Sequence, residues 1–171
     1  MFTLPDLPYA FNALEPFIDE KTMQIHHGKH HAAYVKNVND ALGGLEQFNN
    51  VTIEQLLRDI TKVPEAVRVK VKNNGGGILN HNFFWQIMQP ASNVMAEQRL
   101  DSTFPVVEKI DNQYGGLYKF KEQFAASALG IFGSGWCWLD SDLKIITTPN
   151  QDTISNPILG LDVWEHAYYL K

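Results

Sequence analysis

The sequence contains a single cysteine, Cys137, among its 171 residues, so the chain can form no internal disulfide bond. Its first residues, Met-Phe-Thr-Leu-Pro, lack the basic start and apolar run of a signal peptide. The uncharged stretch at residues 123–139 is too short and too rich in glycine to span a membrane. Positive charge is also scarce, because 14 Lys and Arg stand against 19 Asp and Glu and the formal net charge is −5. The sequence therefore predicts a cytoplasmic protein that binds neither nucleic acid nor a membrane.

Proline, glycine and capping residues divide the first half of the chain into an arm and three helical segments. Residues 1–20 contain three prolines among apolar side chains and predict an extended, packed arm. A helix is predicted from Thr22, a capping residue, to Leu42, which precedes a Gly-Gly pair. Thr52 has a Gln three residues later, as in a capping box, so a short helix is expected to begin there. A third, longer segment covers residues 65–88, between two prolines.

The third segment contains the run Asn-Asn-Gly-Gly-Gly at residues 73–77. Each glycine costs a helix about 1 kcal/mol relative to alanine, so a loop is one interpretation. The other interpretation is a helix whose missing side chains let another group approach closely. Gly77, His81 and Trp85 favour the helix, because their spacing of four places open space, a potential metal ligand and an aromatic wall in line.

The second half begins with a polar stretch, residues 91–103, which we take as the boundary between domains 1–90 and 91–171. Beyond it the expected elements are helices at 105–114 and 117–129, and strands at 136–140, 143–148 and 157–163. The second of these helices has an apolar face made of Leu117, Phe120, Phe124 and Leu129. The first two strands form a hairpin, and the third delivers Asp162 to the start of a final helix.

Four of the six histidines lie within residues 26–31. In a helix, His26 and His30 share one face with Tyr34, while His27 and His31 share a neighbouring face. Periodicity does not decide which face binds a ligand, and a solvated surface cluster is an alternative. His81, taken alone beside aromatic residues, is more often a hydrogen-bonded core residue than a metal ligand.

Asp162 and His166 stand four residues apart near the end of the chain. On a helical turn this spacing puts both side chains on one face, although an N-cap Asp followed by an unrelated surface His is the alternative. With His81 and one clustered histidine they would provide three imidazoles and one carboxylate, which suit manganese or iron. The sequence lacks the His-Glu-x-x-His of zinc proteases, the paired Glu-x-x-His of di-iron bundles and the cysteines of structural zinc sites.

Several stretches resemble the iron/manganese superoxide dismutases, and the resemblance covers essentially the whole chain. They are residues 4–9, 25–34, 80–85, 133–139 and 150–152, and the segment Asp-Val-Trp-Glu-His-Ala-Tyr-Tyr at 162–169, which is close to diagnostic. The resemblance implies an α+β fold, in which an N-terminal helical hairpin precedes a C-terminal α/β domain with a three-stranded antiparallel sheet. The metal would lie between the two.

The resemblance also implies a role for each site residue. It makes His26, His81, Asp162 and His166 the metal ligands, and so selects the His26 face of the first helix. His30 and Tyr34 would line the path of superoxide to the metal, and Trp85, Trp136 and Trp164 would wall the metal. Gln151 would be the hydrogen-bond partner of the solvent on the metal, with Tyr34 next in the proton path.

The implied activity is disproportionation of superoxide to dioxygen and hydrogen peroxide at one manganese or iron ion per subunit. Manganese is favoured, because manganese members of the family usually have glycine at the position of Gly77 and take their glutamine from the position of Gln151. A homodimer or a dimer of dimers is expected, with Glu165 reaching His166 of the other subunit and Tyr169 reaching its His30. The family continues beyond the position of Lys171 with a segment that carries an arginine, so a longer natural protein is expected. The alternative to an enzyme is a noncatalytic metal-binding remnant, and a zinc hydrolase is a more distant third.

Overall fold

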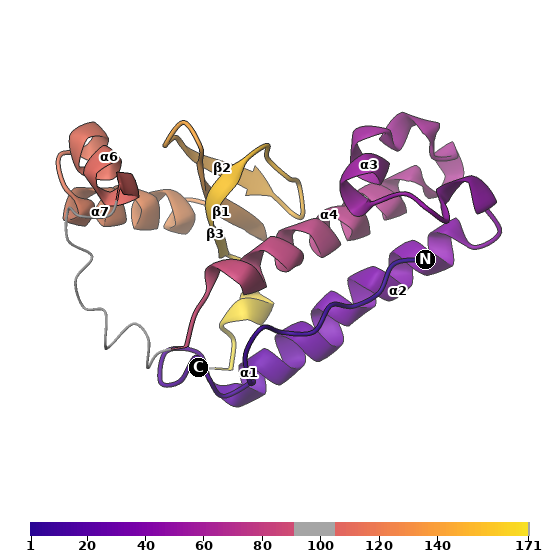
Figure 1. Ribbon diagram of the computed structural model, residues 1–171, viewed down its shortest axis with the longest axis horizontal. Coiled ribbons are helices and arrows are strands. Elements are labelled where there is room, and N and C mark those ends of the chain that lie inside the picture. The colour runs from indigo at the N-terminus through magenta and orange to yellow at the C-terminus, as the bar shows by residue number, and fades with distance from the viewer. Residues whose placement is uncertain (91–104, 171) are drawn as a thin grey trace.

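A computed structural model describes residues 1–90 and 105–170, and in it two helical rods lie side by side (Figure 1). The first rod consists of α1 (Glu20–Ile25), the π-helical turn η1 (His26–His31) and α2 (Ala32–Leu42), and the second is α4 (Glu65–Ile87). Between them in sequence come the 3-10 turn η2 (Glu46–Phe48), α3 (Ile53–Arg58) and the 3-10 turn η3 (Ile60–Lys62).

The capping box at Thr52 is confirmed. The Thr52 hydroxyl accepts a hydrogen bond from the Gln55 backbone N–H, and the Gln55 side chain accepts one from the Thr52 backbone N–H. The predicted end of the first rod at Leu42 is also confirmed, with Gly43 following it.

Three details of this region differ from the prediction. The first helix begins at Glu20 rather than Thr22, because the carboxylate of Asp19 accepts a hydrogen bond from the Thr22 backbone N–H and so acts as the cap. The helix also widens into the π-helical turn η1, which periodicity did not predict. Residues 11–17 of the arm form successive turns instead of an extended strand.

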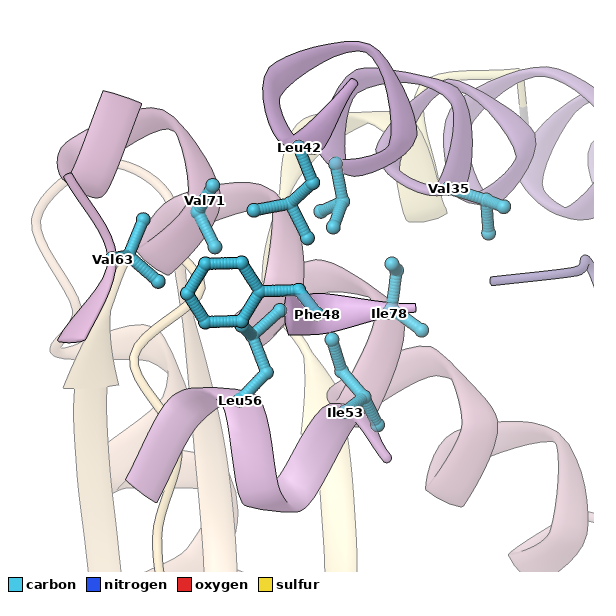
Figure 2. Close-up of a cluster of buried hydrophobic side chains, with 9 residues drawn as sticks. Val35, Leu42, Phe48, Ile53, Leu56, Val63, Val71 and Ile78 are labelled. Carbon is cyan, nitrogen blue, oxygen red and sulfur yellow. The ribbon is translucent and has the colours of Figure 1, made fainter. Parts of the chain in front are cut away.

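The glycine run at residues 73–77 is helical, and packing explains why. The core of this region brings α2, α3 and α4 together around nine buried side chains, eight of them labelled in Figure 2. A Cβ atom on Gly75 would lie 3.0 Å from Leu57 Cδ2. The missing side chain therefore lets α3 pack closely on α4, and burial of the apolar cluster offsets the low helix propensity of glycine.

The C-terminal region consists of α6 (Pro105–Tyr114), α7 (Leu117–Leu129) and an antiparallel sheet in the order β2-β1-β3. Its strands are β1 (Gly135–Asp140), β2 (Ile145–Pro149) and β3 (Pro157–Asp162). Both helices and the predicted hairpin are confirmed. The central strand β1 pairs Trp136 with Thr148 on one side and with Asp162 on the other.

Three predictions for this region are corrected. The second strand begins at Ile145 rather than residue 143, because Leu143 has φ 60° and lies in the turn. Leu129 is 87% exposed, and Ala128 takes the expected place in the core. The final segment is the 3-10 turn η4 (Glu165–Ala167), not an α-helix.

The predicted fold class is confirmed: a helical N-terminal region precedes a region with a three-stranded antiparallel sheet. The polar stretch at residues 91–103, where we placed the domain boundary, lies outside the described residues. Within 1–90 and 105–170, no helix is long and apolar enough to cross a membrane. Strand β3 packs against α4, and its last residue, Asp162, lies beside His81 in the C-terminal part of the second rod.

Candidate metal centre

Four side chains from four separate elements converge beside the C-terminal part of α4. They are His26 from η1, His81 from α4, Asp162 from the end of β3 and His166 from η4, and one potential ligand atom of each lies within 4.8 Å of the others. His26, His81 and Asp162 are at most 4% exposed. These are the four residues named as ligands by the family resemblance.

The distances within the cluster suit a single ion. Asp162 Oδ2 lies 3.1 Å from His26 Nε2, 3.1 Å from His166 Nε2 and 3.5 Å from His81 Nε2, and the two buried Nε2 atoms are 3.0 Å apart. A metal with bonds of about 2.1 Å and angles of 90–120° separates its ligand atoms by about 3.0–3.6 Å. The donor set of three imidazole nitrogens and one carboxylate oxygen fits manganese or iron.

In both His81 and Asp162, the polar atom that does not face the cluster forms a hydrogen bond with the backbone. His81 Nδ1 lies 2.7 Å from the carbonyl oxygen of Gly77, which can only accept, so Nδ1 carries the proton and Nε2 presents a lone pair. Asp162 Oδ1 accepts a hydrogen bond of 2.9 Å from the Trp164 backbone N–H, which turns Oδ2 toward the histidines. Asp162 thus caps a turn with one oxygen, as in the N-cap interpretation. Its other oxygen points toward the histidines, as the ligand interpretation requires.

The electrostatics of the cluster favour an ionised Asp162 carboxylate and a neutral His26 imidazole, the forms that bind a metal. Burial by itself would raise the pKa of Asp162, but hydrogen bonds from His166, His26 and His81 outweigh it and hold the pKa well below 3.8. Burial lowers the pKa of His26 to about 4, against the opposing hydrogen bond to Asp162.

Aromatic rings surround the histidines. Trp85 meets the His26 ring edge-on at 4.9 Å, Trp136 meets the His81 ring edge-on at 5.3 Å, and Trp164 stacks on the His166 ring at 5.4 Å. The three tryptophans expected around the metal therefore all contact cluster residues. Such walls limit the access of water and strengthen electrostatic interactions inside the site.

A hydrogen-bond network links the turn after β2 to the first rod. Gln151 is 4% exposed, and its amide nitrogen donates to the Tyr34 hydroxyl at 3.1 Å. Its amide oxygen accepts from Trp136 Nε1 at 3.0 Å and from Asn80 Nδ2 at 3.2 Å. Burial raises the pKa of Tyr34 to about 12, so the phenol stays protonated near neutral pH.

The other three histidines of residues 26–31 have different neighbours. His30 stacks on the His166 ring at 4.4 Å, and burial lowers its pKa. His27 turns away, and its Nε2 lies 2.8 Å from the Pro5 carbonyl oxygen. His31 is fully buried behind the cluster and accepts a hydrogen bond from Trp85.

Sequence reasoning assigned no role to Asn80, to His31 or to the π-helical turn. Asn80 stands next to His81, but only the fold shows that its amide reaches Gln151. His31 belonged to the alternative face of the first helix, and no sequence signal marked the change of helix type that moves it. The contacts of Asn80 and of His31 join segments far apart in the chain.

Comparison with known families agrees with this geometry over most of the chain. The model of the α-hairpin domain of iron/manganese superoxide dismutases matches residues 1–89, and the model of their C-terminal domain matches residues 102–171. Since the first match alone spans more than half of the sequence, the chain belongs to the iron/manganese superoxide dismutase family.

Proposed function

We propose that this protein is a superoxide dismutase with one manganese or iron ion held by His26, His81, Asp162 and His166. The observation that carries the proposal is the convergence of these four donor atoms within 4.8 Å at a largely buried site. Membership of the family supports the same conclusion, because both family models describe superoxide dismutase domains.

A bound manganese or iron ion would supply one-electron redox chemistry, oxidising one superoxide to dioxygen and reducing a second to the peroxide level. The second half of the reaction needs two protons to release hydrogen peroxide. Gln151 donates to the Tyr34 oxygen, so the hydrogen of that hydroxyl is free to point toward another acceptor. Tyr34, Gln151 and the partly exposed His30 are the residues to which we assign proton delivery and the path of superoxide.

Manganese is the metal we favour. A Cβ atom on Gly77 would lie 2.6 Å from the Tyr34 ring, so that position has no room for a side chain, and the amide that donates to Tyr34 comes from Gln151. This arrangement supports the manganese-like pattern of the resemblance. Reconstitution of the metal-free protein with each metal separately tests the choice, and activity with iron alone would overturn it.

We further propose a homodimer or a dimer of dimers with Glu165 and Tyr169 at the interface. Both side chains are exposed and lie beside His166 on the segment that follows β3. The division into domains 1–90 and 91–171 and the cytoplasmic location stay predictions from the sequence.

The test of function measures superoxide decay and metal content on the same preparation. We expect the rate to scale with the manganese or iron occupancy. His81→Ala should lose most of the metal and the activity, whereas His27→Gln, on the same histidine cluster but outside the site, should keep both. A protein that binds the metal fully yet leaves superoxide decay at the uncatalysed rate would instead be the noncatalytic remnant.

A further inference from the structure

The π-helical turn η1 changes which side of the first rod His31 faces. In a regular α-helix, residues five apart are separated by about 500°, or about 140° beyond one full turn, so His31 would point well away from His26. In η1 the Ala32 N–H instead donates to the carbonyl of His27, five residues earlier. Residues five apart then lie nearer to one another around the axis, and both His26 and His31 are buried against α4.

The hydrogen bond between Trp85 and His31 determines the tautomer of the imidazole. Trp85 Nε1 lies 3.0 Å from His31 Nδ1, and an indole nitrogen can only donate. Nδ1 is therefore the acceptor, and the proton of the neutral ring is on Nε2. The bond is fully buried and joins side chains 54 positions apart, so it ties η1 directly to α4.

His31 contacts two of the four candidate ligands: it touches His81 directly and reaches His26 through Trp85. Its ring stacks on that of His81 at 5.3 Å, with 24° between the planes. The indole that it holds meets the His26 ring edge-on at 4.9 Å and lies 5.7 Å from the His81 ring. A rotation of the His26 or the His81 ring would move its Nε2 atom. These two atoms are 3.0 Å apart, and that of His81 lies 3.5 Å from Asp162 Oδ2.

We infer that His31 is a positioning residue of the metal centre: its Nδ1 holds the Trp85 indole, and its ring supports His81, so that two ligand rings keep their orientation. The inference rests on the proposed function only in that a metal binds the cluster. Partners that orient metal ligands typically change metal affinity by about 10- to 100-fold when they are removed.

Two substitutions separate the hydrogen bond from the packing. His31→Asn places an amide oxygen near the position of Nδ1 and keeps an acceptor, whereas His31→Leu fills a similar volume without one. The Mn(II) dissociation constant of the full chain is measured against a competing chelator. We expect affinity about 10- to 100-fold weaker for His31→Leu. His31→Asn, which keeps the acceptor but loses the ring stacked on His81, should show a clearly smaller loss.

A second readout follows the indole directly. Each of the four tryptophans donates from Nε1 to a different acceptor, so their indole N–H resonances report separate bonds. In the metal-free full chain, His31→Leu should shift chiefly the Trp85 resonance, assigned with Trp85→Phe. If His31→Leu fails to fold, Trp85→Phe removes the same bond from the donor side and should weaken Mn(II) binding similarly.

Unchanged affinity and an unchanged Trp85 resonance in His31→Leu would overturn the inference. Equal losses in His31→Asn and His31→Leu would also overturn it, because the acceptor would then have no role. A wild-type protein that binds Mn(II) but removes superoxide with neither manganese nor iron would refute the proposed function and leave this inference standing, since neither readout depends on turnover.

Discussion

Replacing Gly76 with alanine would push apart α4 and the turn that carries Gln151. A Cβ atom at this position would lie 2.0 Å from the Gln151 carbonyl oxygen and 3.1 Å from its carbonyl carbon. Ordinary contact begins near 3.4 Å, so the oxygen must move by about 1.4 Å, the difference between 3.4 and 2.0 Å. The obstacle is backbone rather than the end of a flexible side chain, and rotation about a side-chain bond cannot relieve it.

The cost follows from the contacts that this movement strains. Overpacking of a buried site costs about 1–3 kcal/mol. Asn80 Nδ2 donates to Gln151 O at 3.3 Å and to Gln151 Oε1 at 3.2 Å, so displacement of the turn lengthens bonds that have little margin. Each buried polar group left unpaired costs about 1–3 kcal/mol, whereas alanine returns about 1 kcal/mol of helix propensity. We expect a net loss of about 2–4 kcal/mol.

Urea unfolding of the metal-free protein measures this loss, and Gly75→Ala is the matched control. Its Cβ would meet Leu57 Cδ2 at 3.0 Å and Ile53 Cδ1 at 3.3 Å, which are ends of side chains that can adjust. The control carries the same gain in helix propensity and should lie within about 1 kcal/mol of wild type. Since 1 kcal/mol shifts the Tm of a chain of this size by about 2–4 °C, Gly76→Ala should unfold roughly 5–15 °C lower.

Equal stabilities of Gly76→Ala and Gly75→Ala would contradict this prediction. That result would mean that the Gln151 turn moves away from α4 without losing buried hydrogen bonds. It would also remove the reason for treating Gly76 as a position that sets the location of Gln151.

Three further predictions concern the proposed chemistry and assembly. Tyr34→Phe should keep the metal content but slow superoxide removal in stopped-flow decay, because in the proposed function the phenol delivers a proton and is not a ligand; loss of the metal would contradict this role. The pKa values of His26 and His31 are lowered from 6.5 to about 4 and about 3, so the unfolded metal-free chain binds more protons than the folded chain in this range. Its free energy of unfolding should therefore fall as pH drops from about 6.5 to about 4, by about 3 kcal/mol for His26 alone, in urea titrations at several pH values; a flat profile would refute the assignment. Glu165→Ala should weaken the dimer in sedimentation velocity and lower activity, and a fully active monomeric variant would rule out a shared site.

Several elements were predictable because their signals are local. The capping box at Thr52, the helices at 105–114 and 117–129 and the hairpin all follow from side chains within a few residues of each other. Short-range hydrogen bonds and alternation of apolar residues act in the same way in any context, so sequence patterns report them directly. The types of metal ligand were also visible, because three histidines and an aspartate are chemically distinctive.

The start of the first helix and the last segment were less predictable, although both are local features. Asp19 and Thr22 are each competent caps, and only backbone geometry selects Asp19. Asp162 and His166 do converge, but from a strand end and a 3-10 turn instead of one helical face. A spacing of four residues is compatible with both arrangements.

By itself, then, the sequence determined the secondary structure of most segments, the residue types of the candidate ligands and the family resemblance. The tertiary structure decided which side of the first rod faces the candidate ligands and whether the three glycines are helical. It also brings His26 and Asp162 together across 136 positions. The contacts of Gly76 exist because the Gln151 turn packs against α4, and the π-helical turn places both His26 and His31 against α4. Such features depend on packing between distant segments, whose energy does not appear in any local pattern of residues.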